Sequence, residues 1–311
     1  MILAITMNPS LDKVYLVDDF SVDKVFRTKE YTATAGGKGL NVARVIKAMG
    51  YDITASGLLG GLNGQFINNQ LQAIEINNQF VEISGETRTC LNITDNLNNT
   101  TTEVLEAGPE IKEHEINNFL NKYKQLVKKA DVITASGSLP RGLTTDFYRN
   151  LIKIANKNNK KIILDTSGDY LKEAIKEKPY MIKPNEEEIS YLFKDGYKNI
   201  VDYIQPLIKL KKMGIKRPII TLGKKGALGL YDGKAIHFQP PEVEPVNVVG
   251  SGDAFVAGCA IGLLENDYIQ TLKKGMACGI ANTLYMKTGK VTKQKVEEFI
   301  NKVKVKKIYE K

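Results

Sequence analysis

The chain has 311 residues, of which 42% are hydrophobic and 25% charged, the composition of an ordinary globular protein with a sizeable core. Its 44 Lys and Arg against 35 Asp and Glu leave a formal net charge of +9, which favours anionic ligands in general. Three cysteines without paired spacing and two distant histidines argue against a disulfide framework, a zinc site and a Ser/His/Asp triad.

Two features predict a cytoplasmic protein without a membrane partner. The apolar N-terminus Ile2–Met7 has no basic flank and meets Asn8 and Pro9 at once, which predicts a first strand and no signal peptide. The longest apolar run, Ala254–Leu264, is far shorter than the ~20 residues of a membrane span. The cysteines are typical of buried thiols in a reducing compartment.

The basic residues are scattered along the chain. Short Lys-rich pieces at 209–212 and 302–307 are predicted to be solvated faces or a C-terminal tail. Because no aromatic and basic stripe accompanies them, we expect no nucleic-acid partner, and a nucleic-acid-binding protein stays a remote alternative.

The first part of the chain contains two β-rich excursions. Asp12 follows the first strand at its C-terminal end, where open α/β sheets bind ligands, but on its own an exposed Asx turn explains it better. Residues 12–34 and 86–105 form short β-like pieces without a crossover helix, so we expect one small sheet made from both, a lid over a cleft. The α/β core then comprises residues 1–11, 35–85 and 106–311.

A glycine loop at Ala35–Asn41 opens a predicted helix at Val42–Met49. The donors of Lys38 and Asn41 suit a sugar or a phosphate, and a purely structural glycine turn is the alternative. The loop matches neither a Walker A loop nor the dinucleotide fingerprint. The missing fingerprint counts against a nucleotide-dependent oxidoreductase, the other enzyme class with this α/β pattern.

The rest of the chain has a regular βα pattern. Each strand is short, apolar and followed by a polar or glycine loop, which predicts a mostly parallel sheet with helices on both faces. Because the carboxyl ends of parallel strands share one edge, we expect the polar loops to line a single cleft. The predicted helices are 113–129 and 146–157, and the predicted strands are 131–135, 162–166, 180–183 and 218–222.

The stretch from Gly250 to Asp253 precedes an apolar helix-like run. Its backbone N–H groups can converge on an anion at the helix N-terminus, and Asp253 can take a proton from an attacking hydroxyl. One loop would then hold both parts of a phosphoryl-transfer site. On this stretch alone, a glycine-rich helix start with an acidic first turn explains the residues equally well.

Together, the loops resemble the ribokinase-like sugar kinase family, also called PfkB, over nearly the whole chain. The shared segments occur in the order of the family. They are Asn8-Pro9-x-x-Asp12, Ala35-Gly36-Gly37-Lys38-Gly39-x-Asn41, Ser136-Gly137-Ser138-Leu139-Pro140, Lys183-Pro184-Asn185-x-x-Glu188, Thr221-Leu222-Gly223-x-x-Gly226 and Gly250-x-Gly252-Asp253.

This resemblance implies roles for individual residues, with ATP and Mg²⁺ as cofactors. Asp253 would be the general base, and Gly250, Ser251 and Gly252 the anion hole. Asn185 and Glu188 would act on Mg²⁺ and its waters. The ATP site would be lined by Lys183, Asn185, Thr221, Gly223, Gly226 and Asn282. Sugar hydroxyls would be held by Asp12, Gly36, Gly37, Asn41 and Ser138.

Within the family, Lys38 and Thr87-Arg88 resemble the branch that acts on phosphorylated ketohexoses. A substrate phosphate requires Arg or Lys donors, for which Arg88 is the first candidate and Arg27 and Lys38 the next. Surface ion pairs on the lid are the alternative for both arginines. The expected reaction is tagatose-6-phosphate to the 1,6-bisphosphate, with 1-phosphofructokinase or 6-phosphofructokinase activity as alternatives. A small exposed sheet also predicts a homodimer through the lid.

Overall fold

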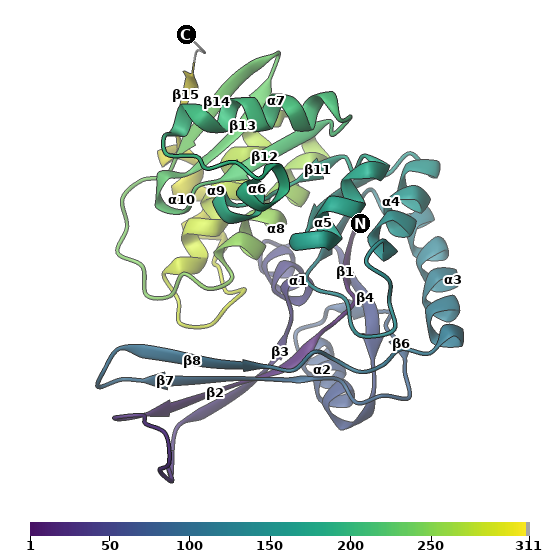
Figure 1. Cartoon of the computed structure of the whole chain (residues 1–311), viewed down its shortest axis with the longest axis vertical. Coiled ribbons are helices and arrows are strands. Elements are labelled where there is room, and N and C mark those ends of the chain that lie inside the picture. Colours follow the sequence, from purple (N-terminus) through teal and green to yellow (C-terminus); the bar gives the residue numbers. More distant parts are fainter. Residues whose placement is uncertain (309–311) are drawn as a thin grey trace.

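The computed structural model describes residues 1–308 and has an α/β core built on one large sheet (Figure 1). Its strand order is β15-β14-β13-β12-β11-β10-β9-β1-β4-β5, and β6 also pairs with β4. The pairs from β5 to β12 are parallel, which confirms the predicted mostly parallel sheet. These strands are β1 (Ile2–Thr6), β4 (Ile53–Leu59), β5 (Asn77–Asn78), β6 (Val81–Glu82), β9 (Val132–Ser136), β10 (Lys161–Asp165), β11 (Met181–Ile182) and β12 (Arg217–Thr221).

One edge of the sheet is antiparallel. The strands β13 (Ala227–Tyr231), β14 (Lys234–Gln239) and β15 (Lys304–Ile308) pair in turn beyond β12. Residues 302–307 are therefore not a free tail, whereas the alternative prediction of a solvated face is confirmed, since most of their side chains are exposed. The segment reads as polar because β15 is an edge strand with mostly exposed side chains, and lysines on edge strands discourage pairing with other chains.

Helices cover both faces of the sheet, and the side chains of β1 alternate between the two cores. Ile2 and Ala4 pack in one core with α1, α2, α8, α9 and α10, whereas Leu3 and Ile5 pack in the other with α3 to α7. The first group is α1 (Lys38–Ala48), α2 (Gly61–Ala73), α8 (Ser251–Glu265), α9 (Tyr268–Thr283) and α10 (Lys293–Lys302). The second is α3 (Glu113–Lys129), α4 (Phe147–Lys157), α5 (Gly168–Ala174), α6 (Glu186–Phe193) and α7 (Ile204–Lys212).

Short 3-10 turns occupy Ile175–Glu177, Ile200–Tyr203 and Gly223–Lys225.

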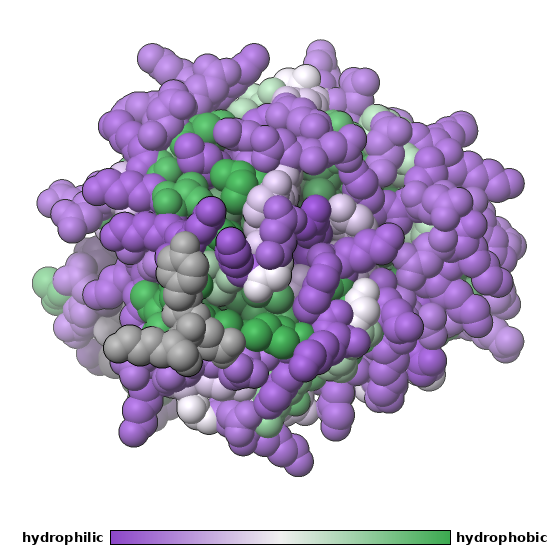
Figure 2. Space-filling model, turned by 90° about the horizontal axis from the view of Figure 1, so that it is seen from above, coloured by the Kyte–Doolittle hydropathy of each residue, from purple (hydrophilic) through white to green (hydrophobic). Residues whose placement is uncertain are grey.

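Seen from the end opposite the small sheet, the surface is mostly hydrophilic, with limited apolar areas between the polar side chains (Figure 2). Within residues 1–308, no helix is long and apolar enough to cross a bilayer.

A small sheet of four strands projects from the core (Figure 1), and we refer to it as the lid. It consists of β2 (Ser10–Val17), β3 (Tyr31–Gly36), β7 (Thr89–Asp95) and β8 (Thr100–Leu105), in the order β3-β2-β7-β8. The predicted assembly of one sheet from two separate excursions is confirmed. Its inner end, at Ser10 and Gly36, joins the core beside the start of α1.

Candidate active site

The candidate site lies at the carboxyl edge of the parallel strands, where α1 and α8 also begin. The loops after β1, β9, β10, β11 and β12 all reach this edge, as expected for ligand sites in open α/β sheets. Residues predicted from separate loops, including Asp12 and Asp253, therefore lie along this edge, although these two are 241 positions apart in the sequence.

The N-terminus of α8 has the backbone geometry of an anion site. Its N-cap, Gly250, has φ 79° and ψ 0°, a left-handed conformation that favours glycine. The first N–H groups of a helix have no intrahelical acceptors and carry the positive end of the helix dipole. Ser251, Gly252 and Asp253 form this first turn, and a Cβ at Gly252 would lie only 3.4 Å from Nζ of Lys183.

Asp253 is a buried carboxylate held by an amide. Nδ2 of Asn41 donates to its Oδ2 at 2.6 Å, and the guanidinium of Arg44 in turn donates to Oδ1 of Asn41 and to the carbonyl of Ala35. Burial and the nearby charge of Asp165 raise the pKa of Asp253 from 3.8 to about 7, against the lowering effects of Asn41, Lys38 and Lys183. A carboxyl with this pKa is suited to general-base catalysis near neutral pH.

Asp165, at the end of β10, is a site residue that the sequence reasoning missed. Its fully buried carboxylate lies 3.2 Å from Nζ of Lys183 and 3.7 Å from Nζ of Lys38. Burial raises the pKa of Asp165, but the two ammonium groups lower it further, so it stays below its usual value. The available signal was an acidic residue closing an apolar strand at the ligand-binding edge.

Lys38 was predicted to bind the phosphate of the substrate, and its surroundings suggest another position. The charges of Asp165, Asp253 and Glu188 all act on its ammonium group, and Asp165 makes the largest contribution to its raised pKa. Lys38 therefore lies with Lys183 beside the buried carboxylate of Asp165. Its side chain is 44% exposed, which leaves it accessible to a ligand.

Asn185 and Glu188 form a capping box at the start of α6. Oδ1 of Asn185 accepts from the Glu188 N–H at 2.8 Å, and Oε2 of Glu188 accepts from the Asn185 N–H at 2.9 Å. Burial raises the pKa of Glu188, and the charge of Asp165 adds to this effect. The carboxylates of Glu188 and Asp165 interact electrostatically. Such a pair suits Mg²⁺, which takes one or two protein carboxylates and completes its shell with water and phosphate oxygens. Residues 1–308 contain no group of three or more His, Cys, Asp or Glu side chains that could hold an ion unaided.

Some of the residues predicted to bind ATP lie in the loop after β12, whereas Asn282 makes its hydrogen bonds within the protein. Thr221 contacts the carbonyl of Pro184 and precedes the 3-10 turn that contains Gly223, where a Cβ would meet nothing within 4 Å. Asn282 is fully buried, and it donates to the carbonyl of Val249 and accepts from the N–H of Gly289. The Asn282 amide thus holds the loop that precedes α8.

Asp12 and Gly36 lie on the neighbouring strands β2 and β3 at the base of the lid, where Asp12 pairs with Thr34 and Gly36 with Ser10. Oγ of Ser10 donates to Oδ1 of Asp12 at 2.6 Å, and burial raises the pKa of the carboxyl. A Cβ at Gly36 would lie 2.0 Å from Cγ of Asp12, so only glycine allows this carboxylate to stay in place. At neighbouring Gly37 a Cβ would lie 3.1 Å from Cγ2 of Thr6.

A cavity of about 380 Å³ lies between the base of the lid and the loop after β9, and its lining includes Arg88, Ser138, Arg141 and Tyr170. Arg88 donates to the carbonyls of Asn8 and Glu106, and Nε of Arg141 donates to the carbonyl of Gly108. Arg141 was not identified from the sequence. It follows Ser138 by three positions, which was the available signal.

The structure does not bring Arg27 to this cavity. Arg27 is exposed in the loop between β2 and β3, next to Thr28, whose hydroxyl donates to the carbonyl of Leu16. Leu16 is at the outer end of β2, away from the Ser10 end that joins the core.

Comparisons with known proteins agree with the resemblance seen in the sequence. Residues 5–295 match the model of a protein family described as "pfkB family carbohydrate kinase". A tagatose-6-phosphate kinase of Staphylococcus epidermidis is 40% identical, over 98% of this chain and 99% of its own. Phosphofructokinase-2 from Escherichia coli in complex with fructose-6-phosphate is 26% identical with a TM-score of 0.89, over 97% of this chain and 98% of that one.

A third similar structure, of Arabidopsis thaliana ribokinase complexed with ribose and ATP, is 18% identical with a TM-score of 0.79, over 96% of this chain and 98% of that one. At this identity it supports the ribokinase-like fold alone. The family match and the S. epidermidis relative each cover nearly the whole chain, and both describe phosphotransferases that act on carbohydrates. The chain therefore belongs to the pfkB family of carbohydrate kinases.

Proposed function

We propose that this kinase transfers the γ-phosphoryl group of ATP, with Mg²⁺, to a ketohexose phosphate, and that tagatose-6-phosphate is its preferred acceptor. The relative at 40% identity, a tagatose-6-phosphate kinase, supports the choice of acceptor. The structural observation behind the proposal is the cavity that contains two guanidinium groups, those of Arg88 and Arg141.

This cavity suits the phosphate end of the acceptor. Arginine presents its N–H groups in a fork that matches phosphate oxygens. Nε of Arg141 is the atom that bonds to Gly108, which leaves its terminal amino groups for a ligand. Nδ2 of Asn8 donates to Oγ of Ser138 at 3.2 Å, so the Ser138 hydroxyl can donate its own proton. A sugar without a phosphate would leave the terminal amino groups of Arg141 without a ligand partner.

The opposite end of the acceptor would face Asp253. We assign Asp253 to remove the proton of the attacking hydroxyl, and the N–H groups of residues 250–252 to stabilise charge on the transferring phosphoryl group. Lys38 and Lys183 would add positive charge on the same side. Glu188 and Asp165 would be the carboxylates that hold Mg²⁺ or its waters, and the bound ion would neutralise charge on the phosphates.

A comparison of kcat/KM for tagatose-6-phosphate, fructose-1-phosphate and fructose-6-phosphate tests the acceptor. We expect the first to be highest, and a clear preference for either fructose phosphate would assign the chain to a phosphofructokinase activity. Arg88→Ala and Arg141→Ala should each raise KM for the phosphosugar more than tenfold while KM for ATP stays within about twofold, since a charge-assisted hydrogen bond contributes about 1.5–3 kcal/mol. Arg149→Ala, which breaks ion pairs with Glu173 and Glu177, is a matched control.

The two arginine variants also separate a phosphate site from a general loss of structure. With unphosphorylated tagatose as acceptor, neither variant should lower the weak residual kcat/KM. Equal losses with tagatose and with tagatose-6-phosphate would contradict the placement of the phosphate in this cavity.

We also propose that the active form is a homodimer paired through the lid. The lid exposes several large apolar side chains, which are Val22, Val25, Tyr31, Leu97, Val104 and Leu105. Such a surface is typical of one that a second copy covers. Light scattering should give twice the chain mass of 34.6 kDa. Val104→Glu should shift the mass to that of a monomer, and a monomeric wild-type protein at assay concentrations would refute the proposal.

A further inference from the structure

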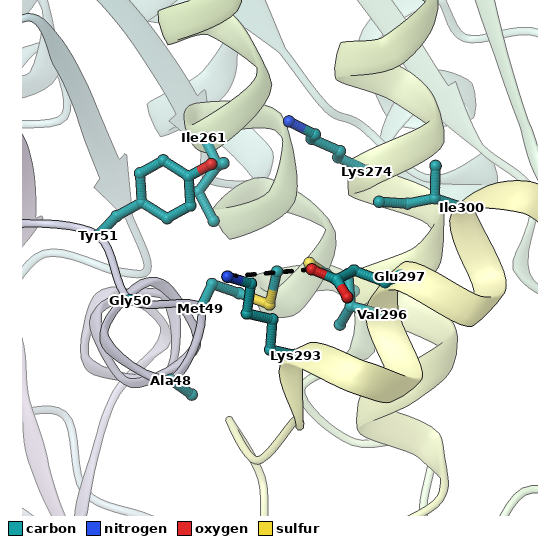
Figure 3. A pocket seen from close by; sticks show the side chains of 11 residues that line it. Ala48, Met49, Gly50, Tyr51, Ile261, Lys274, Lys293, Val296, Glu297 and Ile300 are labelled. Carbon is teal, nitrogen blue, oxygen red and sulfur yellow. Dashed lines mark ion pairs between the residues drawn. The ribbon is translucent and has the colours of Figure 1, made fainter.

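A second cavity, of about 300 Å³, lies away from the carboxyl edge of the sheet, among four helices (Figure 3). The end of α1 and the following Tyr51 form one side, and α10 forms the other. Residues from α8 and α9 lie between them. The volume is at the lower end of the range for small-molecule sites, which are cavities of about 300–1,000 Å³.

The cavity has an apolar lining. Met49, Ile261, Cys278 and Val296 contribute buried side chains to it, and Ile300 adds a partly buried one. In Figure 3, Tyr51 and Met49 lie across the cavity from Val296 and Ile300. A ligand of this lining therefore needs an apolar body, because a fully polar molecule would lose its hydration here without compensation.

Lys293 is the cation at the cavity that is available to an anion. Two lysines, Lys274 and Lys293, and one carboxylate, Glu297, line it. Lys274 is bound to Glu265, so its charge is already matched. Lys293 is 4.0 Å from Glu297, and both side chains are at least 60% exposed, a type of pair that contributes about 0–1 kcal/mol. Lys293 can thus leave Glu297 for a ligand at little cost.

Two of the four helices also carry residues of the candidate active site. Asn41 and Ala48 are on α1, and Asp253 and Ile261 are on α8. At ~1.5 Å per residue, Ile261 is about 12 Å along α8 from Asp253 and Ala48 about 10 Å along α1 from Asn41. The hydrogen bond from Asn41 to Asp253 joins the opposite ends of the same two helices.

We infer that this cavity is a second ligand site, which takes a small organic anion with one negative charge and an apolar tail, and that its occupancy changes the rate of phosphoryl transfer. A molecule between α1 and α10 alters the packing of α1 against α8. Because both partners of the Asn41–Asp253 bond move with these helices, the base is the group that responds. A coupling of this kind is reciprocal, so substrates must also change the affinity for the anion.

Calorimetry with three probes of one chain length tests the binding step. We expect hexanoate to bind saturably, 1-hexanol to bind at least fivefold more weakly, and hexylamine not to bind. Ile300→Trp, which fills the cavity, and Lys293→Glu, which reverses its exposed charge, should each abolish hexanoate binding. Lys295→Glu, on the same helix but outside the cavity, should retain it.

Steady-state kinetics tests the coupling. Saturating hexanoate should change kcat/KM of the wild-type protein at least twofold and leave the Ile300→Trp variant unchanged. Equal binding of hexanoate and hexanol, binding that survives both cavity variants, or no saturable binding would overturn the site. Binding without any kinetic change would overturn the coupling. The calorimetric result does not depend on the identity of the sugar substrate, so it stands or falls apart from the proposed function.

Discussion

The raised pKa of Asp253 predicts that removing its charge stabilises the fold while it abolishes activity. A carboxyl that ionises at 3.8 in the unfolded chain and at about 7 in the folded one favours the folded state only while it is protonated. The free energy of unfolding therefore falls as the pH rises from about 4 to about 7. At about 1.4 kcal/mol per pH unit, the loss amounts to about 4 kcal/mol above pH 7.

Asp253→Asn replaces the carboxylate with a neutral group of the same shape. Urea unfolding of both proteins gives the difference in their free energies of unfolding, which should favour Asn by about 3 kcal/mol more at about pH 8.5 than at about pH 5. Comparison of the two pH values cancels every contribution that does not depend on ionisation. In the same variant, kcat should fall by several orders of magnitude.

Asp232→Asn, a substitution in an exposed turn, controls for the loss of a carboxylate in general. A pH-independent difference for Asp253→Asn, or a wild-type protein that gains relative stability at high pH, would refute the electrostatic reasoning. A variant with kcat within about tenfold of wild type, a change of roughly 1.4 kcal/mol, would refute the assignment of the base.

Two further predictions follow from neighbouring residues. The pH profile of kcat/KM should rise through about pH 7 as Asp253 ionises; Lys38→Met should move this rise to higher pH and Asp165→Asn to lower pH, because the first removes a cation and the second a like charge. Shifts in the same direction would contradict the opposed effects of the two side chains. Gly36→Ala should raise KM for the sugar and leave KM for ATP unchanged, since its methyl group would displace the carboxylate of Asp12, and an unchanged KM for the sugar would separate Asp12 from the acceptor.

The sequence was sufficient for the parts of the fold that depend on local pattern. Buried strands such as β1 appear as continuous apolar runs, and the helix predicted at 113–129 has those bounds in the structure. The lid could be predicted because its two excursions lack any helix long enough for a crossover. The antiparallel edge was missed, since β15 consists mostly of Lys with exposed side chains, which also suits a solvated segment.

The candidate site residues also differ in whether a local sequence pattern was enough to predict them. Asp12, Asn41 and Asp253 could be identified because each follows a strand or a glycine loop. The ion pair of Lys38 with Asp165 could not be predicted, because the two residues are 127 positions apart in the sequence and only the sheet brings them together. Asn282 shows the reverse case. Its residue type suits a ligand, but its amide makes hydrogen bonds within the protein.

The charges of the site also explain why a nucleotide and a divalent cation should bind together. Asp165 engages both Lys38 and Lys183, so these lysines only partly offset the burial of Asp253. A triphosphate alone would add negative charge and hold the proton on Asp253 more tightly. A cation near Glu188 and Asp165 would reverse this effect and free the lysines for the phosphates. Asp253 would then ionise more readily with the nucleotide and its cation bound together than with the nucleotide alone.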